Sequence, residues 1–160
     1  MNIPVLALLI ATGLGIATVG GAVAAAESHE SHASHGSGHS ELTLDHGRPW
    51  PTDGALRHGM TEIRTLMADA LPQIHAGRFA TADYTRLAGG ISDRIEHLAA
   101  NCQLPPDADA QLHLVLARII DGTERMKDAP QAQDGAVAII GAMDSYGRYF
   151  SHPGWQPLSH

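Results

Sequence analysis

Four segments with the apolar periodicity of helices constrain the fold of this chain more than any other feature. Within residues 56–74, apolar side chains recur at steps of three and four, which is the spacing of one helix face. The same pattern recurs in residues 81–102, 107–122 and 128–150. Prolines and glycines separate the segments, and the short connections predict that neighbouring helices are antiparallel. The sequence therefore predicts an all-α fold, an antiparallel up-down-up-down four-helix bundle.

Residues that favour helix ends predict where each helix begins. We expect Thr52 or Asp53 to cap the first helix, Asp107 the third and Asp128 the fourth. Each helix should bury one apolar stripe, and the predicted core positions are Leu56, Met60, Ile63, Met67, Leu71, Ile74, Tyr84, Leu87, Ile91, Ile95, Leu98, Cys102, Leu112, Val115, Leu116, Ile119, Ile120, Ala136, Ile139, Ile140, Met143, Tyr146 and Phe150.

The N-terminal segment, residues 1–26, predicts export. Residues 4–26 carry no charged side chain and end in small residues that suit signal peptidase. The run is also long enough to remain as a membrane anchor, and it lacks the basic residues usual before a signal peptide. Either outcome predicts a periplasmic protein, which would contact a membrane only if this segment stays uncleaved.

Residues 27–41 form a histidine-rich stretch whose composition cannot build a core, so we expect a disordered linker. Histidines at this spacing bind divalent metals loosely, although the stretch can also be read as a solvated linker. The candidate metal ligands are His29, His32, His35 and His39.

The remaining residues, 42–155, predict one domain: an extended arm followed by the bundle, with residues 156–160 as a tail. Trp50, flanked on both sides by proline in the arm, should pack against the bundle. The formal charge of −7 argues against a nucleic-acid partner.

Bundle topology brings the chain's soft and borderline metal ligands to one end. The first and third helices begin at this end, and the second and fourth finish there. Counting about 1.5 Å of rise per residue gives several of these side chains similar depth. Those at similar depth are Met60, His97, His113 and Tyr146. Cys102 and His152 fall at the rim of the same end with His58 nearby, whereas His75 and Met126 fall at the opposite end.

Each of these residues also has a plain structural interpretation. Met60 and Tyr146 are in phase with the core, and a lone histidine such as His113 or His97 is usually structural or exposed. Cys102 is the only cysteine, so it would be a small buried side chain or would form a disulfide-linked homodimer. Their joint occurrence at one end favours a metal or haem site.

Ligand chemistry favours copper at this site. Thiolate, thioether and imidazole together select Cu(I), whereas zinc binds methionine poorly. The helices carry no Glu-x-x-His pair for a di-iron centre, and no C-x-x-C-H motif attaches a c-type haem.

Two resemblances bear on the fold and on the cofactor. Met60 in LRHGMTEI and His152 in YGRYFSHPGW occupy places similar to the axial ligands of periplasmic b-type four-helix cytochromes, which implies non-covalent haem b. LTLDHGRPWPTDGALRHGM, NCQLPPDADAQLH and YGRYFSHPGW resemble motifs of a family of small exported proteins described as DnrO-like. That second resemblance implies a bundle fold and export.

The leading hypothesis is a periplasmic copper protein for buffering, delivery or resistance. Its metal ligands would be Met60, Cys102, His113, His152 and His97, and Tyr146 would contact the cofactor. A haem b electron-transfer cytochrome with Met60 and His152 as ligands is the alternative. A metal-free adaptor that dimerises through Cys102 is a third hypothesis. No feature indicates an oxyanion hole or a nucleotide loop, so we do not expect an enzyme.

Overall fold

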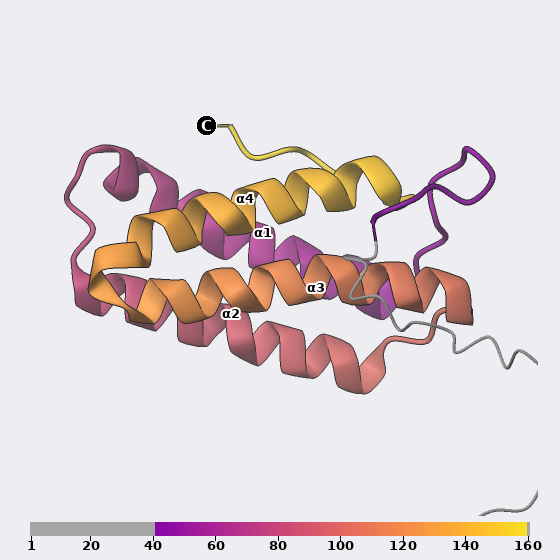
Figure 1. Ribbon diagram of the computed structural model, residues 1–160, viewed down its shortest axis with the longest axis horizontal. Coiled ribbons are helices and arrows are strands. Elements are labelled where there is room, and N and C mark those ends of the chain that lie inside the picture. The colour runs from indigo at the N-terminus through magenta and orange to yellow at the C-terminus, as the bar shows by residue number, and fades with distance from the viewer. Residues whose placement is uncertain (1–40, 160) are drawn as a thin grey trace, which may run out of the picture. The chain divides into compact units, whose positions relative to one another are not determined.

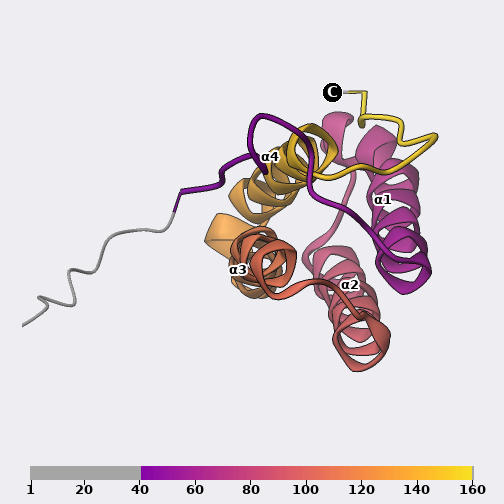
Figure 2. The ribbon, with the colours of Figure 1, turned by 90° about the vertical axis from the view of Figure 1, so that its right-hand side faces the viewer.

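The computed structural model describes residues 41–159, and within them the predicted all-helical bundle is confirmed. The four helices are α1 (Gly54–His75), α2 (Thr81–Asn101), α3 (Pro106–Lys127) and α4 (Ala132–Tyr149). A 3-10 turn, η1 (Ala129–Gln131), precedes α4. Successive helices run in opposite directions (Figure 1), and their ends surround a common centre (Figure 2). No strand occurs in this part of the chain, and none of its helices is long and apolar enough to cross a membrane.

The core contains nearly every apolar position that the periodicity predicts. In α1, for example, Leu56, Met60, Ile63 and Met67 are completely buried. Ile120 is an exception, because 45% of its surface is exposed. Its neighbour Ile119 is fully buried, and consecutive helical residues point about 100° apart, so only one of the pair can face the core.

Two predicted helix caps are wrong. Helix α3 begins at Pro106, whose ring suits the first helical position, and Asp107 therefore lies within the first turn. Asp128 is followed by η1, and its carboxylate accepts a hydrogen bond from the Gln131 side chain. The predicted cap of the first helix is confirmed, because an Asp53 oxygen accepts the Leu56 backbone N–H at 2.7 Å.

The segments that flank the bundle pack against its helices. The Trp50 backbone N–H donates to the Tyr149 carbonyl at 2.8 Å, and its indole N–H donates to the Thr43 carbonyl. Trp50 is partly buried against the core, as the sequence predicts. At the other end of the chain, Arg64 of α1 donates to the Pro157 carbonyl, and Leu158 is buried.

Helices α3 and α4 approach closely at a pair of glycines. A Cβ atom added to Gly135 would lie 2.5 Å from the Gly122 carbonyl oxygen and 2.8 Å from the Met126 nitrogen. Both contacts are with backbone atoms, which cannot rotate away. These two glycines therefore set the separation of the two helices.

We predict that Gly135→Ala destabilises the fold by about 1–3 kcal/mol, the usual cost of overpacking. The matched control is Gly141→Ala in the same helix, where nothing lies within 4 Å of the added methyl group. That change should stabilise the helix by up to about 1 kcal/mol. Urea unfolding measures both values, and equal stability of the two variants would contradict the close approach.

Candidate functional site

One end of the bundle carries a group of ionisable side chains from segments far apart in the sequence. We call Asp53, Arg57, Cys102, Tyr146 and His152 the polar cluster. Asp53 and Arg57 lie at the start of α1, and Cys102 caps the C-terminus of α2. Tyr146 lies in the last turn of α4, and His152 follows that helix. Figure 2 views the bundle from this end.

Asp53 joins the start of α1 to the connection between α2 and α3. One carboxylate oxygen accepts the Leu56 N–H, and the other accepts the Gln103 N–H at 2.6 Å. The Cys102 thiol also donates to this carboxylate, with 3.8 Å between sulfur and oxygen. Burial opposes ionisation, but the bonds from Gln103, Leu56 and Cys102 outweigh it and lower the pKa of Asp53. Asp53 therefore stays negatively charged.

Cys102 is a half-buried thiol whose surroundings disfavour the thiolate. Burial and the negative charge of Asp53 raise its pKa to about 11. The thiolate is the reactive form of cysteine, so at neutral pH this thiol is held protonated. An unpaired cysteine in this state resists oxidation and alkylation.

Tyr146 is completely buried, and its hydroxyl lies 3.0 Å from Nδ1 of His152. Its ring packs against Phe150, at 5.3 Å between centroids, and edge-on against Trp155, at 4.9 Å. Burial raises the pKa of Tyr146, so the phenol remains protonated. The aromatic rings thus hold His152 in a fixed position beside the end of α4.

His152 is held in the neutral form that binds metals. Burial and the nearby positive charge of Arg57 lower its pKa below the ordinary 6.5. When Nδ1 carries the proton and donates to the Tyr146 oxygen, Nε2 keeps a free lone pair. Hydrogen bonding through the other ring nitrogen is how proteins usually orient a histidine ligand.

Arg57 provides the positive charge of the polar cluster. Its guanidinium donates to the Thr52 carbonyl at 2.7 Å and to the Thr52 hydroxyl, which in turn donates to the Ser151 carbonyl. This charge favours ionisation of Asp53 and disfavours protonation of His152.

A shallow groove of about 460 Å³ opens beside His152. Its other lining residues come from α4 and from the segment that follows, and they are Asp144, Gly147, Arg148, Trp155 and Pro157. Trp155 lies against Gly147, where an added Cβ atom would be 2.5 Å from the indole nitrogen. The groove gives a small solute access to His152 from solvent.

The structure brings some of the predicted ligands together and separates others. His152 contacts the Tyr146 hydroxyl, and Cys102 lies at the same end of the bundle, near enough for its charge to affect the pKa of that tyrosine. Met60 is completely buried in the core, and His97 is exposed. His113 is also exposed, with its ring nitrogen 2.9 Å from the Asp109 carbonyl of its own helix.

Other candidate residues lie away from the polar cluster or outside the described chain. The exposed ring of His58 lies 3.5 Å from the Glu62 carboxylate. Within residues 41–159, no three His, Cys, Asp or Glu side chains are grouped so that they could hold a metal ion. The histidine tract lies outside the described residues, and it comprises His29, His32, His35 and His39.

Sequence reasoning treated Asp53 only as a helix cap and gave no role to Arg57. The signal for Asp53 was its position beside the end of α2, where bundle topology also places the only cysteine. Arg57 had no comparable signal, because its role depends on the charges that folding brings around it.

Comparisons with known proteins give no relative for this chain. No family model matches it, and neither the curated proteins nor the solved structures include a similar protein.

We predict that Cys102 reacts slowly with iodoacetamide at pH 8 and that its rate rises with an inflection near pH 11, because only the thiolate reacts. Asp53→Asn removes the negative charge beside the sulfur and should raise the rate at pH 8, by about tenfold for each unit that the pKa falls. Asp121→Asn, in the distant half of α3, is the control. An inflection near the ordinary pKa in the parent protein would rule out this environment.

We predict that NMR titration gives His152 a pKa below 6.5, because burial and Arg57 both disfavour its protonated form. Arg57→Gln should move this pKa upward, although burial keeps it below the ordinary value. A pKa at or above 6.5 in the parent protein would show that the ring is more solvated than its contacts indicate.

Proposed function

We propose that this chain is an exported copper-binding protein and that the polar cluster holds Cu(I) between the Cys102 sulfur and the His152 imidazole. One observation carries the proposal: both side chains act on the buried phenol of Tyr146 at the same end of the bundle. His152 is hydrogen-bonded to this hydroxyl, and Cys102 is near enough for its charge to affect the phenol's pKa.

The donor chemistry supports Cu(I) over harder ions. A thiolate is a soft ligand that selects Cu(I), and a neutral imidazole is a good partner for copper. Cu(I) also tolerates few ligands, so one sulfur and one nitrogen from the same end of the bundle suffice. The contact with Tyr146 orients His152, and the groove beside that residue provides an entry path.

The same proposal gives roles to the N-terminal part of the chain. Residues 1–26 direct export, and the histidines of residues 27–41 capture copper weakly before transfer to the bundle. A protein of this kind would buffer or deliver copper in the periplasm. Holding Cys102 protonated until copper arrives would protect the thiol in an oxidising compartment.

The test is the affinity of the purified protein for Cu(I), measured against a chromophoric chelator. We predict that Cys102→Ser and His152→Ala each weaken binding at least about tenfold. His113→Ala and His97→Ala change exposed histidines on the neighbouring helices and should leave the bundle site unaffected. Because the His tract also binds copper, the comparison uses protein in which its histidines are replaced by serine. Unchanged affinity in Cys102→Ser would refute the proposal.

The pH dependence of Cu(I) affinity is a second test of the same site. Binding expels one proton from Cys102, whose pKa is about 11, whereas His152 is already neutral above pH 7. The affinity for Cu(I), corrected for protonation of the competing chelator, should therefore rise about tenfold per pH unit between pH 7 and pH 9. Cys102→Ser should abolish this slope.

One variant distinguishes the copper proposal from the alternative of a haem b cytochrome. Met60→Leu should leave Cu(I) affinity unchanged, because Met60 is buried in the core and has no part in the proposed pair. A haem-binding protein would instead show a Soret band with added haemin and would lose it in Met60→Leu.

A further inference from the structure

The residues that follow α4 turn back and reach α1 (Figure 2). The turn begins at His152, whose carbonyl accepts the Trp155 N–H at 3.1 Å. Pro153 and Gly154 take its two central positions, and Gly154 has a φ of +81°, as in a type II turn. We call residues 155–158, which leave this turn, the C-terminal segment.

Arg64 of α1 holds the C-terminal segment by its backbone. Its Nε donates to the Gln156 carbonyl, and its Nη2 donates to the Pro157 carbonyl at 3.3 Å. The guanidinium forms no ion pair with a carboxylate of residues 41–159, so both of its hydrogen bonds go to this segment. Hydrogen bonds from a charged donor are stronger than those between neutral groups. Arg64 is therefore a polar anchor that joins α1 to a part of the chain 92 residues away.

Leu158 is a second, apolar anchor of the same segment. Only 6% of its surface is exposed, and it belongs to the hydrophobic core. It lines a hollow together with Arg64, Leu71 and Pro72 of α1. The C-terminal segment is thus held against α1 at two neighbouring points, by contacts of different chemistry.

The segment that α1 holds forms the surroundings of His152. The Trp155 ring centroid lies 5.1 Å from that of His152 and 4.9 Å from that of Tyr146. Pro157, whose carbonyl accepts from Arg64, lines the groove beside His152 together with Trp155. One wall of the groove therefore depends on a contact with α1, outside the polar cluster.

His152 lies after α4, so no helical hydrogen bond fixes its place. The chain before it is tied to the arm, because the Ser151 N–H donates to the Trp50 carbonyl and the Ser151 carbonyl accepts from the Thr52 hydroxyl. The chain after it is tied through the C-terminal segment. Without the contacts of Arg64, the imidazole would keep its bond to Tyr146 but lose the support of the aromatic wall.

We propose that Arg64 is a positioning residue for His152, because it holds Trp155 and Pro157 in place around the imidazole and so prepares His152 for Cu(I). Arg64 itself does not touch the metal. The link to copper rests on the proposed function, whereas the placement of the imidazole can be measured in metal-free protein. Loss of a residue that orients a metal ligand usually weakens metal binding by about 10–100-fold.

The first test is NMR of the metal-free, full-length protein, which should show NOEs between the indole of Trp155 and the ring of His152. Arg64→Met removes both hydrogen bonds but keeps an unbranched side chain, and it should weaken or abolish these NOEs. Arg64→Lys keeps a charged donor without the planar fork, so it should restore them in part. Leu158→Ala removes the other anchor and should act in the same direction. Unchanged NOEs in both Arg64→Met and Leu158→Ala would overturn the proposal.

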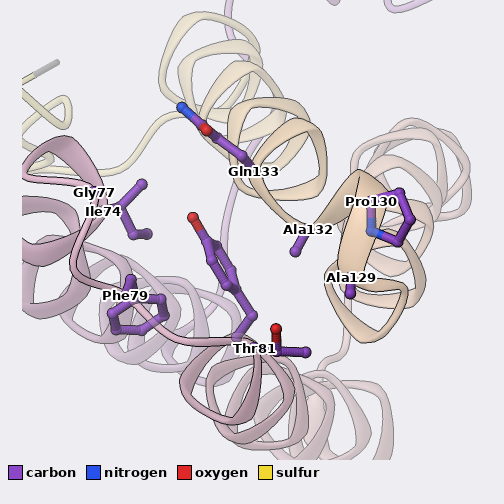
Figure 3. Close-up of a pocket in the computed structure, with 9 residues that line it drawn as sticks. Ile74, Gly77, Phe79, Thr81, Ala129, Pro130, Ala132 and Gln133 are labelled. Carbon is purple, nitrogen blue, oxygen red and sulfur yellow. The ribbon is translucent and has the colours of Figure 1, made fainter.

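Two controls separate this role from general effects of substitution. Arg118→Met removes an exposed arginine of α3 and makes the same change of charge. Ala129→Met adds a methionine at an exposed position of η1. Figure 3 shows Ala129 in a hollow whose lining includes no residue of the C-terminal segment. Both controls should keep the NOEs and the Cu(I) affinity of the parent protein.

The second test is Cu(I) affinity in protein whose histidines in residues 27–41 are replaced by serine. Arg64→Met should weaken binding by about tenfold, the lower end of the usual range, and Arg64→Lys should recover part of the loss. Parental affinity in Arg64→Met, with the NOEs lost, would overturn the role in copper binding. If the parent itself binds no Cu(I) at the polar cluster, the proposed function fails, and the NOEs alone then decide whether Arg64 positions His152.

Discussion

The carboxylate of Asp53 is the contact on which the arrangement of the polar cluster depends. It accepts hydrogen bonds from the first turn of α1, from the connection between α2 and α3, and from the Cys102 thiol. A single carboxylate thus holds the connection between α2 and α3, caps the start of α1 and positions the only cysteine. Because its pKa is lowered, Asp53 remains charged, and its charge adds to burial in keeping the neighbouring thiol protonated. The start of α1 and the state of Cys102 are therefore linked through one side chain.

The position of His152 depends on packing rather than on a helix. Trp155 can lie against α4 because Gly147 has no side chain, and the indole packs against both Tyr146 and His152. Tyr146 adds a hydrogen bond at the buried end of this group. A histidine oriented by a phenol and an aromatic wall is prepared to bind a ligand without a large loss of conformational entropy.

The sequence predicts the helices well because their signal is local. Steps of three and four residues identify the stripe from Leu56 to Ile74, and nearly all predicted core positions are buried. Caps are less predictable where two signals compete, as at Asp107, where Pro106 takes the first helical position. The apolar pattern also does not decide between two consecutive isoleucines. Ile119 occupies the core, and its neighbour Ile120 is exposed.

The candidate site is harder to predict because depth along a helix does not determine which way a side chain faces. Counting rise places His113 level with Met60, but Leu112 takes the core-facing position and His113 points to solvent beside Asp109. Cys102 and His152 lie at the expected end, whereas the burial and the nearby charges that shift their pKa values arise only when distant segments fold together.

The central claim is that a sulfur and an imidazole from different segments share one copper ion. X-ray absorption at the copper edge, on protein loaded with one equivalent of Cu(I), tests it most directly. The histidines of residues 27–41 are replaced by serine in this sample. We predict a first shell of one sulfur and one imidazole nitrogen, with the sulfur lost in Cys102→Ser. A shell without sulfur, unchanged in Cys102→Ser, would contradict the account.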